Sequence, residues 1–397
     1  MKIVTLPLWS LSLSIMLGIA FQTAMSQTPA EHALNINIGF NGRLDQFPHA
    51  DDFYKQMDLF YASIPHAVPG NRHCHTYISW DIAEPNVPAG AASTEGTRAW
   101  FKSWLDHAEG HCARALITFK HIGGVTVNSP NGYPTVATYQ HAMNLFLHTN
   151  WSKAWTGAFD YTAWNEPNNP RGSGNGLTVK IPAERAADYY LALRALCKPT
   201  SCGLRGGGNV AAGDFGSNGL WKDFVQNCPN DLAAALCANA SYMDKYKHWL
   251  ATDTKKFPSL ASTFRPEVFA YHGWDDINNF LHGNQCTDQQ RCTIRAFTRA
   301  LSGNSWTGSV FWDTEVGAGQ DGKTNPGPVK QACAASFLMK LTASVSPRFA
   351  RIYYTRAFNS DGEHGSLFNA SGAPKPAFEV LVQRNISYKP PAGQSCP

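Results

Sequence analysis

The sequence predicts an α/β protein, a (β/α)8 TIM barrel that forms one domain. Short apolar, β-branched or aromatic runs alternate with amphipathic stretches, and this alternation implies parallel strands joined by helical crossovers. Eight such runs follow one another, most of them about 40 residues apart. No G-x-G-x-x-G motif follows the first run, so a dinucleotide-binding sheet has little support. Eight units fit a closed barrel better than an open sheet.

The expected elements follow in chain order. The predicted strands are Asn35–Asn41, Cys74–Trp80, Arg114–His121, Phe159–Asn165, Gly203–Asn209, Glu267–His272, Ser309–Thr314 and Phe349–Thr355. The predicted helices between them are Asp51–Ser63, Glu95–His107, Thr135–His148, Pro182–Leu196, Asp288–Leu301 and Val329–Ala343. The segment Ala211–Arg265 is longer than one crossover needs, which predicts an extended loop and helix insertion after strand five.

The N-terminus has the pattern of a secretory signal peptide, residues 1–26. Lys2 gives a positive start, the stretch Ile3–Phe21 is mostly apolar, and Ala24-Met25-Ser26 is a small-x-small cleavage site. An uncleaved membrane anchor is the alternative, but one proline and several serines weaken it. The barrel domain is therefore predicted to be residues 27–397, secreted or periplasmic.

Ten cysteines on an exported chain predict disulfides. Spacing suggests the pairs Cys197–Cys202, Cys228–Cys237 and Cys286–Cys292, and leaves Cys74–Cys112 and Cys333–Cys396, although sequence alone cannot fix the connectivity. A zinc site is the rival interpretation. Neither C-x-x-C nor H-E-x-x-H occurs, and His73 and His75 flank Cys74 on the opposite strand face. We therefore expect no metal and no cofactor.

Composition excludes some partners. The formal net charge is only +4, too small to imply binding to nucleic acid. After the signal no second apolar run is long enough to span a bilayer. The expected partner is a carbohydrate, with a monomer and no membrane contact after signal cleavage.

Two glutamates carry the chemical prediction. Tyr161-Thr-Ala-Trp-Asn-Glu166 and Val310-Phe-Trp-Asp-Thr-Glu315 are apolar strand-like runs that each end near a carboxylate. In a barrel both would point into the mouth at the C-terminal ends of strands four and seven. Cleavage of a glycosidic bond needs two such groups, one to donate a proton and one to attack the anomeric carbon.

The motif Trp164-Asn165-Glu166-Pro167-Asn168 resembles the acid/base motif of the retaining glycoside hydrolases of clan A. Thr314-Glu315-Val316-Gly317 is similar to their nucleophile strand, most like glycoside hydrolase family 39. The resemblance implies that Glu166 is the acid/base and Glu315 the nucleophile, and that Asn165 binds the sugar 2-hydroxyl.

The resemblance extends to three further segments. Arg72 and the run from Trp80 to Pro85 are similar to the second-strand segment of those enzymes, and Phe269-Ala-Tyr271-His272 resembles their sixth strand. Gly372–Ala377 resembles the start of their terminal helix.

Two departures affect the predicted sugar site. Family 39 often has His-Pro-Tyr at the sixth strand, where this chain has His272-Gly-Trp274, so Tyr271 or Trp274 is expected to contact Glu315. The clan often ends strand eight with a tryptophan, where this chain has Tyr354 and its neighbours. Aromatic rings pack on sugar C–H faces, and Trp80, Trp274, Trp312 and Tyr354 are the candidates. The other predicted substrate-binding residues are Arg72, Asn165, Tyr271 and His272, and His272 is expected either to line the nucleophile pocket or to be a satisfied core histidine.

These residues together predict retention through a covalent intermediate on Glu315. Burial and a neighbouring anion should raise the pKa of Glu166 so that it holds a proton, and Arg72 or a tyrosine hydroxyl should hold Glu315 ionised. A non-hydrolytic carbohydrate-binding barrel and a transglycosylase stay open as alternatives. Sugar, linkage and endo or exo action are not predicted.

Overall fold

The computed structural model describes most of the chain after the N-terminal segment. The described residues are 28, 33, 36–41, 50–64, 72–129, 132–170, 176–197, 208–217, 220–228, 237–261, 264–287, 292–302, 306, 308–318, 326–355, 366–369 and 371–397. The predicted signal peptide lies outside them. No described helix is long and apolar enough to cross a membrane.

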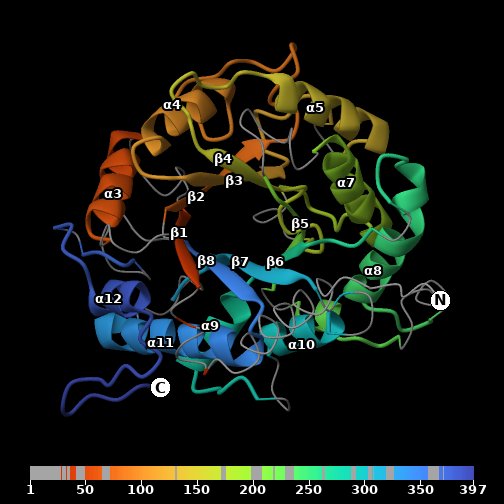
Figure 1. The fold of residues 1–397 in the computed structure, drawn as a ribbon. Coiled ribbons are helices and arrows are strands. Elements are labelled where there is room, and N and C mark those ends of the chain that lie inside the picture. Colours follow the sequence, from red (N-terminus) through yellow and green to blue (C-terminus); the bar gives the residue numbers. More distant parts are fainter. Residues whose placement is uncertain are drawn as a thin grey trace, which may run out of the picture.

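Eight parallel strands close into one barrel, so the predicted (β/α)8 TIM fold is confirmed (Figure 1). Each strand pairs with the next along the chain, and β8 pairs with β1 to close the ring. The strands are β1 Asn37–Asn41, β2 His73–Ser79, β3 Arg114–Lys120, β4 Ala158–Thr162, β5 Val210–Phe215, β6 Val268–His272, β7 Val310–Val316 and β8 Phe349–Thr355.

Strand five is the one strand that the sequence placed wrongly. The prediction was Gly203–Asn209, but β5 begins at Val210 and pairs with β4 and β6. Its residues Ala211, Ala212 and Gly213 have little intrinsic strand preference, so pairing with the neighbouring strands and burial decide its position. The register shifts between Gly213 and Phe215, where a bulge forms at Asp214.

Helices surround the barrel (Figure 1). They are α3 Ala50–Ala62, α4 Arg98–Ala108, α5 Val136–His148, α7 Ala183–Leu196, α8 Tyr242–Thr252, α9 Trp274–Leu281, α10 Thr293–Ala300, α11 Gly327–Val345 and α12 Pro376–Gln383. The six predicted helices are all present, with shifted ends. Between β5 and β6 the short helices η2 Trp221–Phe224 and η4 Asp253–Lys256 accompany α8, which confirms extra structure after strand five.

Helix α9 was not among the helices predicted from the sequence, and Trp274 is its first residue. The helix starts directly after β6, and Asp275 and Asp276 lie in its first turn, where carboxylates are favourable near the helix N-terminus. Both oxygens of Asp276 also accept hydrogen bonds from the first backbone N–H groups of α10, at 2.7 Å from Thr293 and 3.0 Å from Ile294.

The barrel interior consists of three layers. Six residues form its apolar middle: Leu116, Ala211, Val268, Ala270, Trp312 and Tyr353. Toward the N-terminal ends of the strands, Asp160 is bound by Arg114 at 2.5 Å and Arg351 at 2.6 Å. Toward the C-terminal ends lies the second polar layer, which contains the candidate site. A larger apolar core packs the outer strand faces against the helices.

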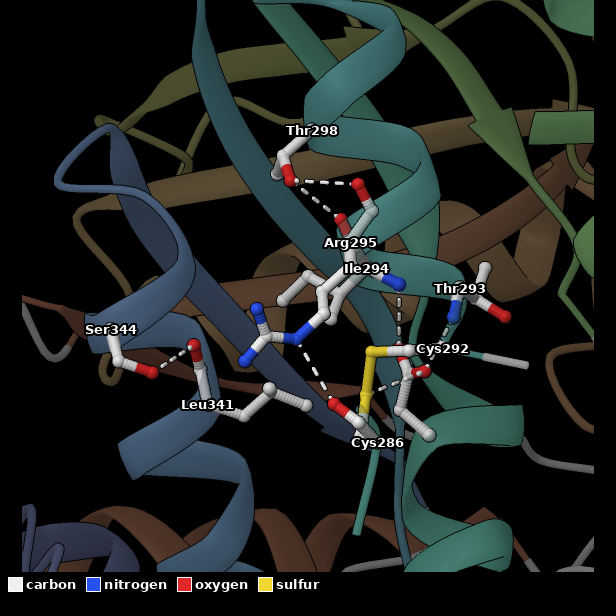
Figure 2. The surroundings of a disulfide bond; sticks show 9 residues. Cys286, Cys292, Thr293, Ile294, Arg295, Thr298, Leu341 and Ser344 are labelled. Atoms are coloured by element: carbon white, nitrogen blue, oxygen red, sulfur yellow. Dashed lines mark hydrogen bonds between the residues drawn. A yellow bond between two sulfur atoms is a disulfide. The ribbon is translucent and has the colours of Figure 1, made fainter. Parts of the chain in front are cut away.

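Four of the suggested disulfides are present: Cys74–Cys112, Cys228–Cys237, Cys286–Cys292 and Cys333–Cys396. Cys197 is also disulfide-bonded, and its suggested partner Cys202 lies outside the described residues. Figure 2 shows how Cys286–Cys292 joins the end of the α9 loop to the start of α10, with Arg295 Nε donating to the Cys286 carbonyl at 3.0 Å.

Candidate active site

The fold brings Glu166 and Glu315 together at the C-terminal mouth of the barrel. Glu315 lies in β7, and Glu166 lies four residues beyond the end of β4. One carboxylate oxygen of each and a ring nitrogen of His272 all lie within 4.8 Å of one another. Both glutamates are only 6% exposed. The two carboxylate oxygens are thus at most 4.8 Å apart, which fits the short spacing of a retaining pair, roughly 5–5.5 Å, and excludes the roughly 6.5–9.5 Å that leaves room for a water.

Glu166 is held in an unusual backbone conformation. Its φ of 42° lies in the left-handed region, which costs a non-glycine residue free energy and often marks a functional site. The Glu166 N–H donates to the Asp214 carbonyl at 2.8 Å. Its Oε1 contacts His272 Nδ1 at 2.8 Å, and its Oε2 accepts from Asn169 Nδ2 at 2.7 Å. Gly216 is required opposite, because an added Cβ would lie 2.7 Å from Glu166 Cδ.

Glu315 is held by two donors, one from strand β2 and one from the start of helix α9. The Tyr77 hydroxyl on β2 donates to Oε1 at 2.5 Å, and Trp274 Nε1 donates to Oε2 at 3.3 Å. Tyr77 is in turn oriented by Asn41 on β1, whose Nδ2 donates to its hydroxyl oxygen at 2.7 Å. These hydrogen bonds hold the Glu315 carboxylate in a fixed position.

His272 lies among three carboxylates. Besides the contact to Glu166, its Nε2 is 3.4 Å from Asp214 Oδ1 and 3.7 Å from Glu315 Oε1. Asp214 is fully buried at the β5 bulge with φ 62°, and it accepts hydrogen bonds from Thr314 Oγ1 and, at 3.0 Å, from Thr162 Oγ1. Asp214 therefore binds Glu166 through its backbone and His272 through its side chain.

These contacts set the charges of the site. Burial would lower the pKa of His272, but Glu315, Asp214 and Glu166 together hold that pKa well above its ordinary value. Burial acts to raise the pKa of Glu166, yet the hydrogen bond and charge of His272 lower it overall. The resting pair is therefore an imidazolium beside a carboxylate. The expected raised pKa of Glu166 is wrong for this resting geometry, because His272 supplies a cation that the sequence did not reveal.

Tyr77 stays a neutral donor in this arrangement. Burial, and then the charge of Glu315, raise the pKa of the Tyr77 phenol well above its ordinary value. Its proton is therefore available to the Glu315 carboxylate at every pH near neutrality.

Of the predicted substrate-binding residues, three lie at the mouth. His272 and Trp274 contact the carboxylates directly. Asn165 precedes Glu166, is 2% exposed, and its N–H donates to the Phe119 carbonyl at 2.8 Å. Asn165 lies in the loop after β4, His272 is the last residue of β6, and Trp274 is the first residue of α9.

The structure does not bring the other five predicted substrate-binding residues to the mouth. Arg72 precedes β2 and so lies at the opposite end of the barrel. Trp80 packs outward near Tyr139, with ring centroids 6.5 Å apart. The remaining three are buried: Tyr271 stacks on Phe297, Trp312 lies in the apolar middle layer, and Tyr354 accepts from the Ala318 N–H. Strand alternation turns Trp80, Tyr271 and Tyr354 away from the barrel axis.

The sequence missed Tyr77, Asn169, Asp214 and Lys120. Lys120 ends β3, is 8% exposed, and its ammonium lies 5.0 Å from the centre of the Tyr77 ring. The signal for Tyr77 and Lys120 was alternation, since inward-facing residues recur every second position along a strand. Asp214 had no such signal, because its inward direction depends on the bulge.

Glu166, His272 and Glu315 could also offer three ligand atoms to a metal ion. Their oxygen atoms instead face O–H and N–H donors from Tyr77, Trp274 and Asn169. Such donors stabilise carboxylates by hydrogen bonding, so a metal ion is not needed to account for the arrangement.

No protein-family model matches the sequence, and no curated protein matches it. Solved structures share its fold. A family 39 glycoside hydrolase from Bacteroides cellulosilyticus WH2 is 15% identical with a TM-score of 0.50, and the match covers 90% of this chain and 64% of that one. The present chain thus spans less than two thirds of that protein.

Two further structures match at a similar level. A family 39 β-xylosidase from Caulobacter crescentus is 12% identical with a TM-score of 0.52, covering 88% of this chain and 70% of that one. A family 39 enzyme from Xanthomonas axonopodis pv. citri is 12% identical with a TM-score of 0.52, covering 91% and 67%. The resemblance to the clan A barrels is thereby confirmed at the level of the fold.

Proposed function

We propose that this protein is a secreted retaining glycoside hydrolase that cleaves a polysaccharide or oligosaccharide by double displacement. The observation that carries the proposal is the pair Glu166 and Glu315, delivered by β4 and β7 to one mouth with oxygen atoms within 4.8 Å of a shared histidine nitrogen and of one another. The four disulfides between described cysteines support export to an oxidising compartment.

In the first step the Glu315 carboxylate attacks the anomeric carbon while a proton passes from Glu166 to the departing glycosidic oxygen. The bond to the leaving sugar breaks, and a glycosyl ester to Glu315 forms. In the second step Glu166, now a carboxylate, takes a proton from water. That water attacks the anomeric carbon and frees Glu315, so the configuration is retained.

The proton for the first step is held by the Glu166–His272 pair. Transfer along the 2.8 Å contact from His272 Nδ1 to Glu166 Oε1 gives a protonated acid and a neutral imidazole. The pair titrates as a unit, so its two macroscopic pKa values belong to both residues together. The role of His272 is to keep one proton beside Glu166 through neutral pH.

The test is an activity screen of the wild type and Glu315→Gln against plant and microbial polysaccharides and aryl β-glycosides. We expect kcat of the variant to fall on the order of 10⁴-fold or more, because the nucleophile is lost. Glu379→Gln is the matched control, since Glu379 is exposed on α12 far along the chain from either strand. Proton NMR of the first product should show the retained anomer.

Other outcomes would redirect the assignment. Inversion at the first turnover would remove the nucleophile role of Glu315. Products longer than the substrate would identify a transglycosylase with the same covalent step. Binding of a glycan without cleavage by the wild type would favour a non-hydrolytic carbohydrate-binding barrel.

A further inference from the structure

Helices α3 and α4 are neighbours on the outside of the barrel (Figure 1). A second cluster of ligating side chains, Asp58, His107 and His111, lies between them. His107 Nε2 is 2.8 Å and His111 Nε2 is 2.7 Å from the same oxygen, Asp58 Oδ1. All three ligand atoms lie within 4.8 Å of one another. The side chains are partly accessible, with exposed fractions of 50% for Asp58, 27% for His107 and 23% for His111.

Both imidazoles are held in place by tyrosines of α3. The Tyr54 ring lies 4.4 Å from the His107 ring, and the Tyr61 ring is stacked on His111 at 5.3 Å with an angle of 16°. The tyrosines are themselves fixed, because Tyr54 donates to Ser103 at 2.8 Å and Tyr61 donates to the His73 carbonyl at 2.6 Å. The packing of these tyrosines fixes both imidazole rings with their Nε2 atoms directed at Asp58 Oδ1.

Helical spacing produces this arrangement. Tyr54, Asp58 and Tyr61 are at i, i+4 and i+7 on α3, so they share the face turned to α4. His107 lies in the last turn of α4, and His111 follows in a hydrogen-bonded turn closed by its N–H to the Ala108 carbonyl at 2.9 Å.

The turn that carries His111 is anchored to the barrel. Cys112 follows His111 directly and forms a disulfide with Cys74 in β2, so the backbone at this histidine is fixed from two sides. The sequence predicts no metal here because Asp58 is 49 positions from His107, too far apart for a spacing motif.

We propose that Asp58, His107 and His111 bind a divalent transition-metal cation such as Zn²⁺. Two imidazoles and a carboxylate are suitable zinc ligands, and water would complete a tetrahedral shell. With metal–ligand bonds of about 2.0–2.1 Å, ligand atoms stand about 3.3 Å apart, so each N–O distance must open by about 0.5 Å. The half-exposed Asp58 side chain can make that adjustment. The bound cation would cross-link α3 to α4 and stabilise the folded state.

The experiment titrates Zn²⁺ into the full chain, in competition with a chromophoric chelator, and records the thermal unfolding midpoint with zinc and with chelator. We expect saturable binding of one Zn²⁺ at this site, and a higher midpoint with zinc. His107→Ala and His111→Ala should each weaken binding at least about tenfold. His148→Ala is the matched control, an exposed histidine in the last turn of the neighbouring helix α5.

Asp58→Asn separates the metal site from a purely structural cluster, because the amide oxygen still accepts hydrogen bonds from both imidazoles but is a poor zinc ligand. We expect this variant to fold and to lose zinc affinity at least about tenfold. Co²⁺ should give d–d absorption bands in the wild type that Asp58→Asn lacks. Absence of saturable zinc binding by the wild type, or equal affinity in the wild type and all three variants, would overturn the proposal. The readouts are independent of glycosidase activity.

Discussion

The two polar layers inside the barrel differ in how their charged side chains are paired. At the N-terminal end of the strands, one buried carboxylate, Asp160, lies between Arg114 and Arg351, and every charge has a partner. At the C-terminal end, three carboxylates surround the single imidazole of His272. The apolar middle layer separates the two. A buried carboxylate paired directly with guanidinium groups is typical of a structural site, whereas several carboxylates gathered around one cation are typical of a reactive site.

Backbone geometry differs in the same sense. The β3–β4 pairing around Asp160 is regular, with parallel register from Arg114↔Ala158 to Thr118↔Thr162. The β7–β8 pairing beside Arg351 has one register shift, between Phe311 and Trp312. At the mouth, Glu166 and Asp214 both have positive φ, and the β5–β6 and β6–β7 pairings shift register. Register shifts therefore occur in both layers, but the two positive-φ residues, Glu166 and Asp214, lie at the end where chemistry is proposed, as expected when strain positions reactive groups.

Asp160→Asn should cause the largest change, and it should affect stability alone. Removing the carboxylate leaves Arg351 buried without its counter-ion, which costs about 3–5 kcal/mol in free energy of unfolding. Urea unfolding at pH 7 measures the loss. Glu267→Gln is the control, since its ion pair with Arg194 at 3.7 Å is solvent-exposed and is worth less than about 1 kcal/mol. A fall in kcat with unchanged stability would contradict the separation of the two layers.

The pH dependence of that loss follows from its cause. Burial would raise the pKa of Asp160, but Arg351 and Arg114 hold that pKa well below its ordinary value. The stabilisation is therefore present above the unfolded pKa of about 3.9 and is lost as pH falls below it. The stability difference between the wild type and Asp160→Asn should shrink below about pH 4.

Asp214→Asn tests the mouth in the same way, and its effect should fall on activity. The backbone carbonyl still binds the Glu166 N–H, but one of the anions that stabilise the His272 imidazolium is gone. His272 also faces Glu166, Glu315, Asp313 and His75, so its pKa should fall without losing all support. We expect kcat/KM to drop about 10²-fold and the alkaline limb of the pH–rate profile to move to lower pH.

Asp313→Asn is the control for that profile. Burial raises the pKa of Asp313 well above its ordinary value, so its carboxyl is neutral and resembles an amide. Its Oδ1 accepts the Gly273 N–H at 3.0 Å, a bond that asparagine can keep. The alkaline limb should not move in this variant. If the alkaline limb did not move in Asp214→Asn either, Asp214 would only fill space and would not support the charge of His272.

The sequence predicted the barrel and the two glutamates because their signals are local. Alternation of strand and helix gives the fold, and Trp164-Asn165-Glu166-Pro167 together with Thr314-Glu315 marks the ends of strands four and seven. Arg72 could have been rejected from the sequence, because a residue before a strand lies at the opposite end of the barrel from the mouth.

The residues that hold the two glutamates, such as Asp214 and Tyr77, were harder to predict, because each contacts a residue from a different part of the chain. Asp214 points inward only through the bulge after Gly213, and no pattern in Val210–Phe215 indicates a left-handed residue. Either Tyr271 or Trp274 was expected to contact Glu315. Trp274 does so at 3.3 Å, whereas alternation turns Tyr271 outward onto Phe297. Tyr77 takes that position from β2, 238 residues away along the chain.

Tyr77→Phe removes a single hydroxyl from the mouth and should have the smallest effect of these variants. Its 2.5 Å hydrogen bond to Glu315 Oε1 stabilises a charged acceptor, and such a bond is worth about 1.5–3 kcal/mol. We expect kcat/KM to fall about 10–100-fold. The thermal midpoint should also fall, because the buried Glu315 carboxylate loses this donor in the resting enzyme. Asn41 Nδ2 keeps its 3.0 Å bond to the Thr314 carbonyl in the variant, so the loss concerns Glu315 and not the packing of β1.

Tyr271→Phe is the matched control, because Tyr271 is equally buried but its hydroxyl has no hydrogen-bond partner among the residues that the structure describes. Removing an unpaired buried hydroxyl should leave kcat/KM unchanged and the thermal midpoint equal or higher, since no bond is lost and a desolvated polar group disappears. If Tyr271→Phe impaired activity while Tyr77→Phe did not, the tyrosine beside the nucleophile would come from strand six, as the family pattern suggested. The reverse result would show that this barrel supplies the same hydrogen bond from strand two, so the chemistry of the mouth constrains the hydroxyl but not the strand that carries it.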